Sequence, residues 1–233
     1  LSDIYAMGAG AQSALAIATV PYGLEAKVET SIREMMAGAI DVLNEAGATL
    51  VGGHTSEGPE LALGFSVNGL ADRETILHKG GMVAGDVLIL TKALGTGTLF
   101  AADMQQKAKG RWIEGALKSM VQSNRQAAQC LFDHGASACT DITGFGLVGH
   151  TVEMTKASGV DVEIDLDSLP VLDGAQETVG LGILSSLQPA NVRLRRAIRN
   201  LNAAGKHERY PLIFDPQTSG GLLASLTEER AQS

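Results

Sequence analysis

The chain has 233 residues, of which 45% are hydrophobic and 19% charged, so it can bury one large core or two modest ones. The formal net charge of −8 argues against a nucleic-acid-binding protein, because phosphate contacts require clustered basic residues. No apolar run approaches the ~20 residues that cross a bilayer, so we expect no membrane contact and a cytoplasmic location.

The basic residues and the cysteines call for no special chemistry. Arg193, Arg195, Arg196 and Arg199 form the one basic cluster, which we interpret as a solvated surface. The two cysteines, Cys130 and Cys139, lack a CxxC partner and are interpreted as reduced core thiols.

The first third of the chain has the pattern of a strand, a helix and two strands. Residues 14–20 form an apolar run closed by Pro21, which is typical of a buried strand. The next segment predicts a helix that ends at Gly47, because its apolar residues recur at helical spacing: Val28, Ile32, Met35, Met36, Ala39, Ile40 and Leu43. Residues 48–51 and 61–67 predict two further strands.

The glycine-rich segment 79–85 indicates a domain boundary, which divides the chain into residues 1–84 and 85–233. Beyond it we predict strands at 86–91, 137–140, 160–166 and 220–226. We predict helices at 98–107, 112–133, 146–158 and 190–201, the third of them stopped by Gly159.

Three short segments are rich in glycine, acidic and hydroxyl residues: 2–8, 52–55 and 140–146. We expect each at the end of a strand or helix, where glycine lets backbone N–H groups approach a phosphate. Asp3 and Asp141 would repel phosphate unless a cation intervenes, so they indicate Mg²⁺, which binds one or two carboxylates together with phosphate oxygens and water.

Each of these features also has an ordinary structural explanation. Asp3 or Asp141 alone could cap a helix or form a turn, Gly52-Gly53 could be a simple turn, and His54 could be a loop histidine. Neither the GxxxxGK[ST] pattern nor a GxGxxG fingerprint after a strand occurs. Spacing alone therefore supports only a weak hypothesis of a nucleotide site.

Five segments, taken in order, resemble the selenophosphate synthetase family (selenide, water dikinases). They are LSDIYAMG at 1–8, GGHT at 52–55, GDVLILTKALGTG at 85–97, TDITGFGLVGH at 140–150 and DPQTSGGLL at 215–223. The resemblance covers essentially the whole chain, and the last two segments are the most specific.

The resemblance implies a two-domain PurM-like fold, shared with aminoimidazole ribonucleotide synthetase: an α/β domain at 1–84, which pairs with a second subunit in a homodimer, and an α+β domain at 85–233. It implies conversion of hydrogen selenide, ATP and water to selenophosphate, AMP and orthophosphate. Asp3 then matches a residue that binds Mg²⁺ and nucleotide, Gly53, His54 and Thr55 an ATP-contacting turn, and Asp141 a second Mg²⁺ ligand.

The chain departs from the family at its start. Family members carry an upstream glycine-rich segment with a cysteine or selenocysteine, a lysine and a further metal-binding aspartate, and this chain shows none of it, so we expect an N-terminally truncated piece without selenide-dependent turnover of its own. No catalytic residue is assigned, because neither Cys130 nor Cys139 matches the nucleophile. The alternatives are another ATP-dependent PurM-like enzyme and a non-catalytic module for dimerisation or nucleotide holding.

Overall fold

The computed structural model describes residues 1–232 and divides into two compact units. The first contains Leu1 and Asp3–Ile76, and the second contains Ser2 and the chain from Leu77 onward. No helix within residues 1–232 is long and apolar enough to cross a membrane.

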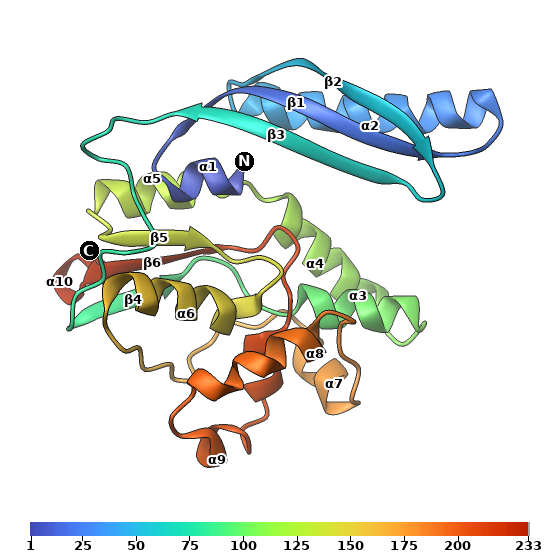
Figure 1. Ribbon diagram of the computed structural model, residues 1–233. Coiled ribbons are helices and arrows are strands. Elements are labelled where there is room, and N and C mark those ends of the chain that lie inside the picture. Colours follow the sequence, from blue (N-terminus) through green and yellow to red (C-terminus); the bar gives the residue numbers. More distant parts are fainter. Residues whose placement is uncertain (233) are drawn as a thin grey trace. The chain divides into compact units, whose positions relative to one another are not determined.

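The first unit is a three-stranded sheet with one long helix on one face (Figure 1). Its elements are α1 (Ser2–Ala6), β1 (Gly10–Pro21), α2 (Glu25–Glu45), β2 (Thr49–Gly58) and β3 (Ala62–Leu70). The strand order is β2-β1-β3, with β1 parallel to β2 and antiparallel to β3. Helix α2 makes the crossover that a parallel pair of strands requires.

Alternation along β1 determines how α2 packs. Ala14, Ala16 and Ala18 are buried, whereas Leu15 and Ile17 between them are exposed. Ala14 shares a small core with Leu43 of α2, and small side chains let a helix approach a sheet closely. The predicted apolar stripe of α2 is confirmed as its more buried side, with the exception of Ile40, which is exposed.

The second unit is built around another three-stranded sheet, in which β4 (Asp86–Leu90) and β5 (Ala138–Asp141) both pair antiparallel with the central strand β6 (Leu222–Thr227). Its core joins the sheet to α6 through Leu147, Met154 and Leu223. The other elements are α3 (Thr96–Met104), α4 (Gly110–Val121), α5 (Arg125–Asp133), α6 (Gly146–Ser158), α7 (Ala175–Gly180), α8 (Gln188–Asn191), η1 (Val192–Ala197), α9 (Leu201–Ala204), η2 (Tyr210–Phe214) and α10 (Glu228–Ala231).

The single helix predicted at 112–133 is wrong, because the chain breaks between α4 and α5. Gln122 leaves helical conformation with ψ 118°, and its carbonyl oxygen accepts a hydrogen bond from Lys92 Nζ at 2.7 Å. Asn124 is buried and donates to the carbonyl oxygen of Gly220 at 2.8 Å. These tertiary hydrogen bonds replace the helical ones at the break.

Two more predicted elements are corrected. Residues 160–166 do not form a strand, although Val160, Val162 and Ile164 do pack against the core. No other strand pairs with this segment within residues 1–232, so its alternation reflects one buried face without a hydrogen-bonded ladder. The predicted helix at 190–201 is instead the end of α8, the 3-10 helix η1 and a turn before α9.

Candidate functional site

Three of the sequence segments singled out above meet at one end of the second sheet. Leu90 at the end of β4 pairs with Leu223, and Asp141 at the end of β5 pairs with Leu222 at the start of β6. The segments 91–97, 141–146 and 215–221 therefore leave or enter the sheet at the same end (Figure 1). Asp141 lies at a strand end, as predicted, and is partly buried.

The 215–221 segment caps α3. The side-chain oxygen Oε1 of Gln217 accepts hydrogen bonds from the backbone N–H groups of Gly95 (3.0 Å) and Thr96 (3.2 Å). Asp215 Oδ2 accepts one from the N–H of Gly97 at 3.0 Å. The first N–H groups of a helix have no partner within it, so these side chains complete the start of α3 and tie it to the strand β6.

Asp215 is fully buried, and this burial raises its pKa to about 7, although hydrogen bonds from Gln217 and Gly97 act in the opposite direction. A carboxyl group with a pKa near neutrality carries its proton for much of the time in the folded protein. Nothing in the sequence marked Asp215 out beyond its place in the DPQTSGGLL segment.

Lys92 also forms hydrogen bonds that stabilise the 215–221 segment. Its Nζ donates to the carbonyl oxygens of Gln122 (2.7 Å) and Ser219 (3.1 Å), and burial lowers its pKa. Ser219 has a φ of 49°, a left-handed conformation uncommon for residues other than glycine. The contact with Lys92 therefore helps to hold a turn that its own backbone preferences disfavour.

The first unit carries the other predicted residues. Asp3 lies in the first turn of α1 and is exposed. Gly53, His54 and Thr55 do not form a turn after a strand, which corrects the expectation, because β2 continues through them to Gly58. They pair in register with Ala16, Ile17 and Ala18 of β1, whose length supplies hydrogen-bonding partners well past residue 51.

Gly53 is required by this pairing. A Cβ at this position would lie 2.0 Å from the carbonyl oxygen of Ala16, which no side chain tolerates without a shift of backbone. His54, its neighbour, is exposed on the strand. The glycine thus has a structural reason in addition to any role toward a ligand.

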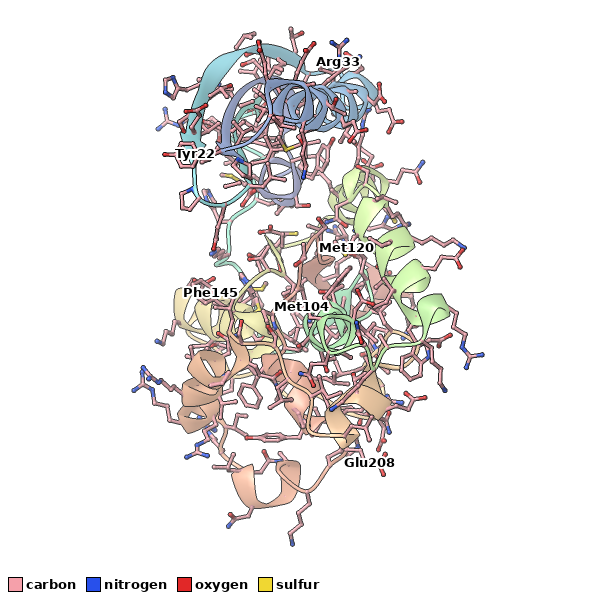
Figure 2. All side chains as sticks on the ribbon, turned by 90° about the vertical axis from the view of Figure 1, so that its right-hand side faces the viewer. Tyr22, Arg33, Met104, Met120, Phe145 and Glu208 are labelled. Atoms are coloured by element: carbon pink, nitrogen blue, oxygen red, sulfur yellow. The ribbon has the colours of Figure 1, made fainter. Side chains whose placement is uncertain are left out.

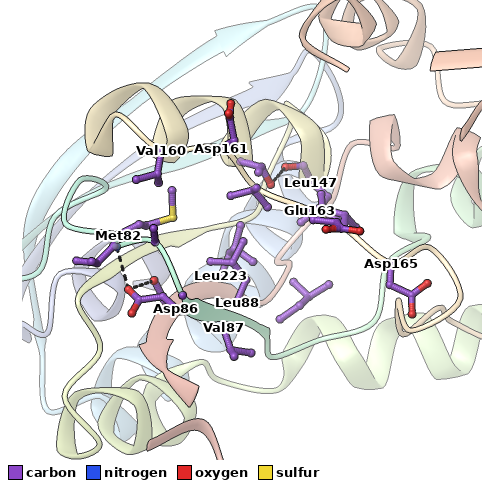
Figure 3. A pocket seen from close by; sticks show the side chains of 18 of the residues that line it. Met82, Asp86, Val87, Leu88, Leu147, Val160, Asp161, Glu163, Asp165 and Leu223 are labelled. Carbon is purple, nitrogen blue, oxygen red and sulfur yellow. Dashed lines mark hydrogen bonds between the residues drawn. The ribbon is translucent and has the colours of Figure 1, made fainter. Parts of the chain in front are cut away.

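A groove of about 410 Å³ runs beside β4, but it holds none of the predicted residues (Figure 3). Met82, Leu88 and Leu223 form part of its wall, and Asp161, Glu163 and Asp165 line it from the segment that follows α6. Asp141 does not line the groove, although Leu90 and Leu223 from the same end of the sheet do.

Comparison with known proteins follows the division into two units. The model of the AIR synthase related protein, N-terminal domain, matches residues 1–71, and that of the C-terminal domain matches residues 83–233. A selenide, water dikinase from Geobacter metallireducens is 40% identical over 234 residues, which cover 100% of this chain and 67% of that protein. The chain belongs to the selenide, water dikinase family of AIR synthase related proteins.

Other members of the family match the chain with similar identity and coverage. The selenide, water dikinase of Caldanaerobacter subterraneus is 39% identical over 100% of this chain and 66% of its own length, and that of Trichlorobacter lovleyi is 42% identical over 97% and 64%. The chain thus spans about two-thirds of the length of these dikinases.

Solved structures confirm the PurM-like fold expected for the family. Escherichia coli HypE matches with a TM-score of 0.75 at 20% identity, over 99% of this chain and 63% of that one. The thiamine monophosphate kinase of Aquifex aeolicus, solved in complex with AMPPCP and TMP, matches with a TM-score of 0.69 at 21% identity, over 98% of this chain and 66% of that one. At these identities the likeness extends to the fold alone.

The residues expected to hold Mg²⁺ can form a cation site only if oxygen atoms of a bound phosphate and of water complete the coordination. Within residues 1–232, no three His, Cys, Asp or Glu side chains cluster closely enough to bind a metal by themselves. Asp141, partly buried at a strand end, can offer one carboxylate, and Mg²⁺ commonly takes its remaining ligands from phosphate and water. The donor set therefore fits a cation that arrives with a nucleotide.

The two cysteines are both free thiols, as expected, but only one is a core residue. Cys139 is buried, and burial together with the charge of Asp141 raises its pKa to about 12. Cys130 is exposed on α5, so its interpretation as a core thiol is wrong.

Proposed function

We propose that this chain forms the greater part of a selenide, water dikinase, which makes selenophosphate, AMP and orthophosphate from hydrogen selenide, ATP and water. The observation that carries the proposal is identity of 36–42% across essentially the whole chain to relatives that are all named selenide, water dikinase. The substrate hydrogen selenide follows from that name.

We assign nucleotide and cation binding to the residues that the sequence indicated. In this proposal Asp141, at the end of the second sheet, binds Mg²⁺, Asp3 in α1 binds both Mg²⁺ and nucleotide, and Gly53, His54 and Thr55 of β2 contact ATP. HypE solved in complex with ATP and the Aquifex kinase solved with AMPPCP support a nucleotide-binding role for this fold. Bound Mg²⁺ would supply charge neutralisation at the phosphates, which phosphoryl transfer needs more than covalent help.

The other ATP-dependent enzymes of this fold are less well supported. Thiamine monophosphate kinases and HypE resemble the chain at 17–21% identity, about half the identity of the selenide, water dikinases. A module that only dimerises would have no need of a carboxylate at the position of Asp141.

A homodimer in the cytoplasm belongs to the same proposal. Leu15 and Ile17 are apolar side chains on the open face of the first sheet, with exposed fractions of 41% and 57%. Exposed apolar side chains that lie together often mark an interaction surface, so we expect a second copy of the chain to bind here. The free thiols Cys130 and Cys139 suit a reducing compartment.

The function is tested by phosphorus NMR of ATP and Mg²⁺ with the natural polypeptide that contains this chain, with and without anaerobic hydrogen selenide. We expect a phosphorus–selenium resonance that appears with AMP and orthophosphate only when selenide is present. Asp141→Asn should reduce this turnover by at least ~100-fold, because the cation loses a charged ligand. ATP consumption that does not depend on selenide would contradict the assignment.

A further inference from the structure

His150 is a buried side chain of α6 that contacts the loop beginning at Asp141. Its exposed fraction is 4%, and its ring nitrogen Nε2 accepts a hydrogen bond from the backbone N–H of Thr143 at 3.1 Å. The hydroxyl oxygen of Thr143 lies 3.3 Å from the same nitrogen. The imidazole thus holds both the main chain and the side chain of one loop residue.

The hydrogen bond from Thr143 also determines which nitrogen carries the proton. An Nε2 atom that accepts from a backbone N–H is unprotonated, so in the neutral ring the proton sits on Nδ1. Nδ1 faces Glu153 Oε2 at 3.4 Å, and the same oxygen accepts a hydrogen bond from Lys79 Nζ at 2.7 Å. Nδ1 makes no hydrogen bond of its own within the described part of the chain, but the negative charge of Glu153 close to it favours the ring orientation that presents Nε2 to the loop.

Thr143 is held from the opposite side as well. Its carbonyl oxygen accepts hydrogen bonds from the backbone N–H groups of Gly146 and Gln217, both at 3.0 Å. The N–H of Ile142 donates to the carbonyl oxygen of Gly221 at 2.8 Å. Among residues 1–232, His150 is therefore one of two side chains that bond to the backbone of residues 143–144, the other being Asn191, whose Nδ2 donates to the carbonyl oxygen of Gly144 at 2.8 Å.

The ring of Phe145, in the same loop, lies over this arrangement. Its centroid is 5.8 Å from that of His150, and Phe145 is 57% exposed. Figure 2 labels Phe145 in the second unit. The imidazole is thus shielded from water on the side of the loop, which strengthens its hydrogen bond to Thr143.

We propose that His150 is a positioning residue for the cation and nucleotide site: it holds Thr143, and through Thr143 it sets the loop that presents Asp141. The inference rests on the proposed function, since it concerns the loop assigned to Mg²⁺. His150 acts through the loop and does not itself bind the cation.

The test is the affinity for Mn²⁺, measured by electron paramagnetic resonance in the presence of AMPPCP, on the natural polypeptide that contains this chain. A glutamine side chain can place a polar atom where His Nε2 lies, whereas an asparagine reaches only the position of Nδ1. We expect His150→Gln to bind Mn²⁺ within about threefold of the wild type and His150→Asn to bind about tenfold more weakly, as for one lost hydrogen bond.

Thr151→Val is the matched control. Thr151 is buried next to His150 on α6, and its hydroxyl group bonds only within the helix, to the carbonyl oxygen of Leu147 at 2.8 Å. This change should lower the melting temperature without altering the affinity for Mn²⁺. In turnover, His150→Asn should raise the Mg²⁺ concentration at half-maximal rate more than it lowers the rate at saturating Mg²⁺.

Equal Mn²⁺ affinities for His150→Gln and His150→Asn would overturn the inference, and so would a Thr151→Val variant as weak as His150→Asn. If either result were found while Asp141→Asn abolished Mn²⁺ binding, the proposed function would stand and only the inference about His150 would be wrong. A wild type that bound neither Mn²⁺ nor AMPPCP would remove the proposed function, and the inference with it.

Discussion

Two aspartates of the second unit show how the surroundings of one residue set its chemistry. Asp86 accepts hydrogen bonds from the hydroxyl groups of Ser137 and Ser225 and from the N–H of Val83. Burial raises the pKa of Asp86, but these hydrogen bonds outweigh that effect and lower it. The pKa of Asp215 is raised instead, because its burial is complete.

The difference predicts opposite effects of pH on stability. The raised pKa of Asp215 contributes stability that is fully present below its ordinary value of 3.8 and is lost as the pH rises through about 7. The side chain of Asp215→Asn is neutral at every pH. The unfolding free energy of this variant should therefore rise relative to that of the wild type over this pH range, by at most ~1.4 kcal/mol per pH unit.

The measurement is urea unfolding at pH 5 and pH 8, followed by the fluorescence of Trp112, the one tryptophan, which lies in a core cluster of the second unit. Asp86→Asn is the control with the other sign. The lowered pKa of Asp86 contributes stability at pH values above its unfolded-state pKa, and this stability is lost on acidification. The unfolding free energy of Asp86→Asn, relative to that of the wild type, should therefore be highest at low pH. A pH-independent difference for Asp215→Asn would show that its carboxyl group stays charged.

At the scale of elements, the second unit relies on helix ends that are completed from distant parts of the chain. The start of α3 is capped by Gln217, which follows it by more than a hundred residues, and the break between α4 and α5 is stabilised by Lys92 and Asn124. Segments 91–97 and 215–221 are therefore coupled through a helix terminus as well as through the sheet.

Gln217→Leu should lower the unfolding free energy of the second unit by ~2–4 kcal/mol, because it leaves the N–H groups of Gly95 and Thr96 buried without a partner. Gln105→Leu provides the control, since Gln105 is exposed at the other end of α3. Trp112 fluorescence during urea unfolding reports both. If the two variants lost similar stability, the capping role of Gln217 would be wrong.

At the scale of the whole molecule, the open face of the first sheet is the feature that bears on assembly. Leu15 and Ile17 point away from the core shared with α2, and Val51 of the neighbouring strand is exposed as well. Burial of apolar area is the main favourable term in subunit association. The proposed homodimer would use this face.

Ile17→Lys should shift the protein from dimer to monomer, because a buried ammonium group without a partner opposes association. Sedimentation velocity over a range of protein concentrations measures the shift. Val121→Lys, at a still more exposed apolar position at the end of α4, should leave the sedimentation coefficient unchanged. A dimer that persisted in Ile17→Lys, or a wild type that sediments as a monomer, would rule out this face as the interface.

By itself the sequence determined the family, the types of most elements and the place of Asp141. The periodicity of α2 and α6 and the apolar runs of β1, β4 and β6 are local patterns, and local patterns predict local structure. Asp141 was placed correctly at a strand end because a short buried strand gives way there to glycine and threonine. Its role toward Mg²⁺, like those of Asp3, Gly53, His54 and Thr55, stays a prediction.

Only the tertiary structure decided where that periodicity fails. The predicted helix at 112–133 breaks where the carbonyl oxygen of Gln122 accepts a hydrogen bond from Lys92. Residues 160–166 form no strand, because no strand within residues 1–232 pairs with them. Segment 52–55 remains in β2 because β1 pairs with it. The roles of His150 and Gln217 were also visible only in the tertiary structure. Packing determines which groups their side chains hydrogen-bond to, and sequence periodicity does not predict such partners.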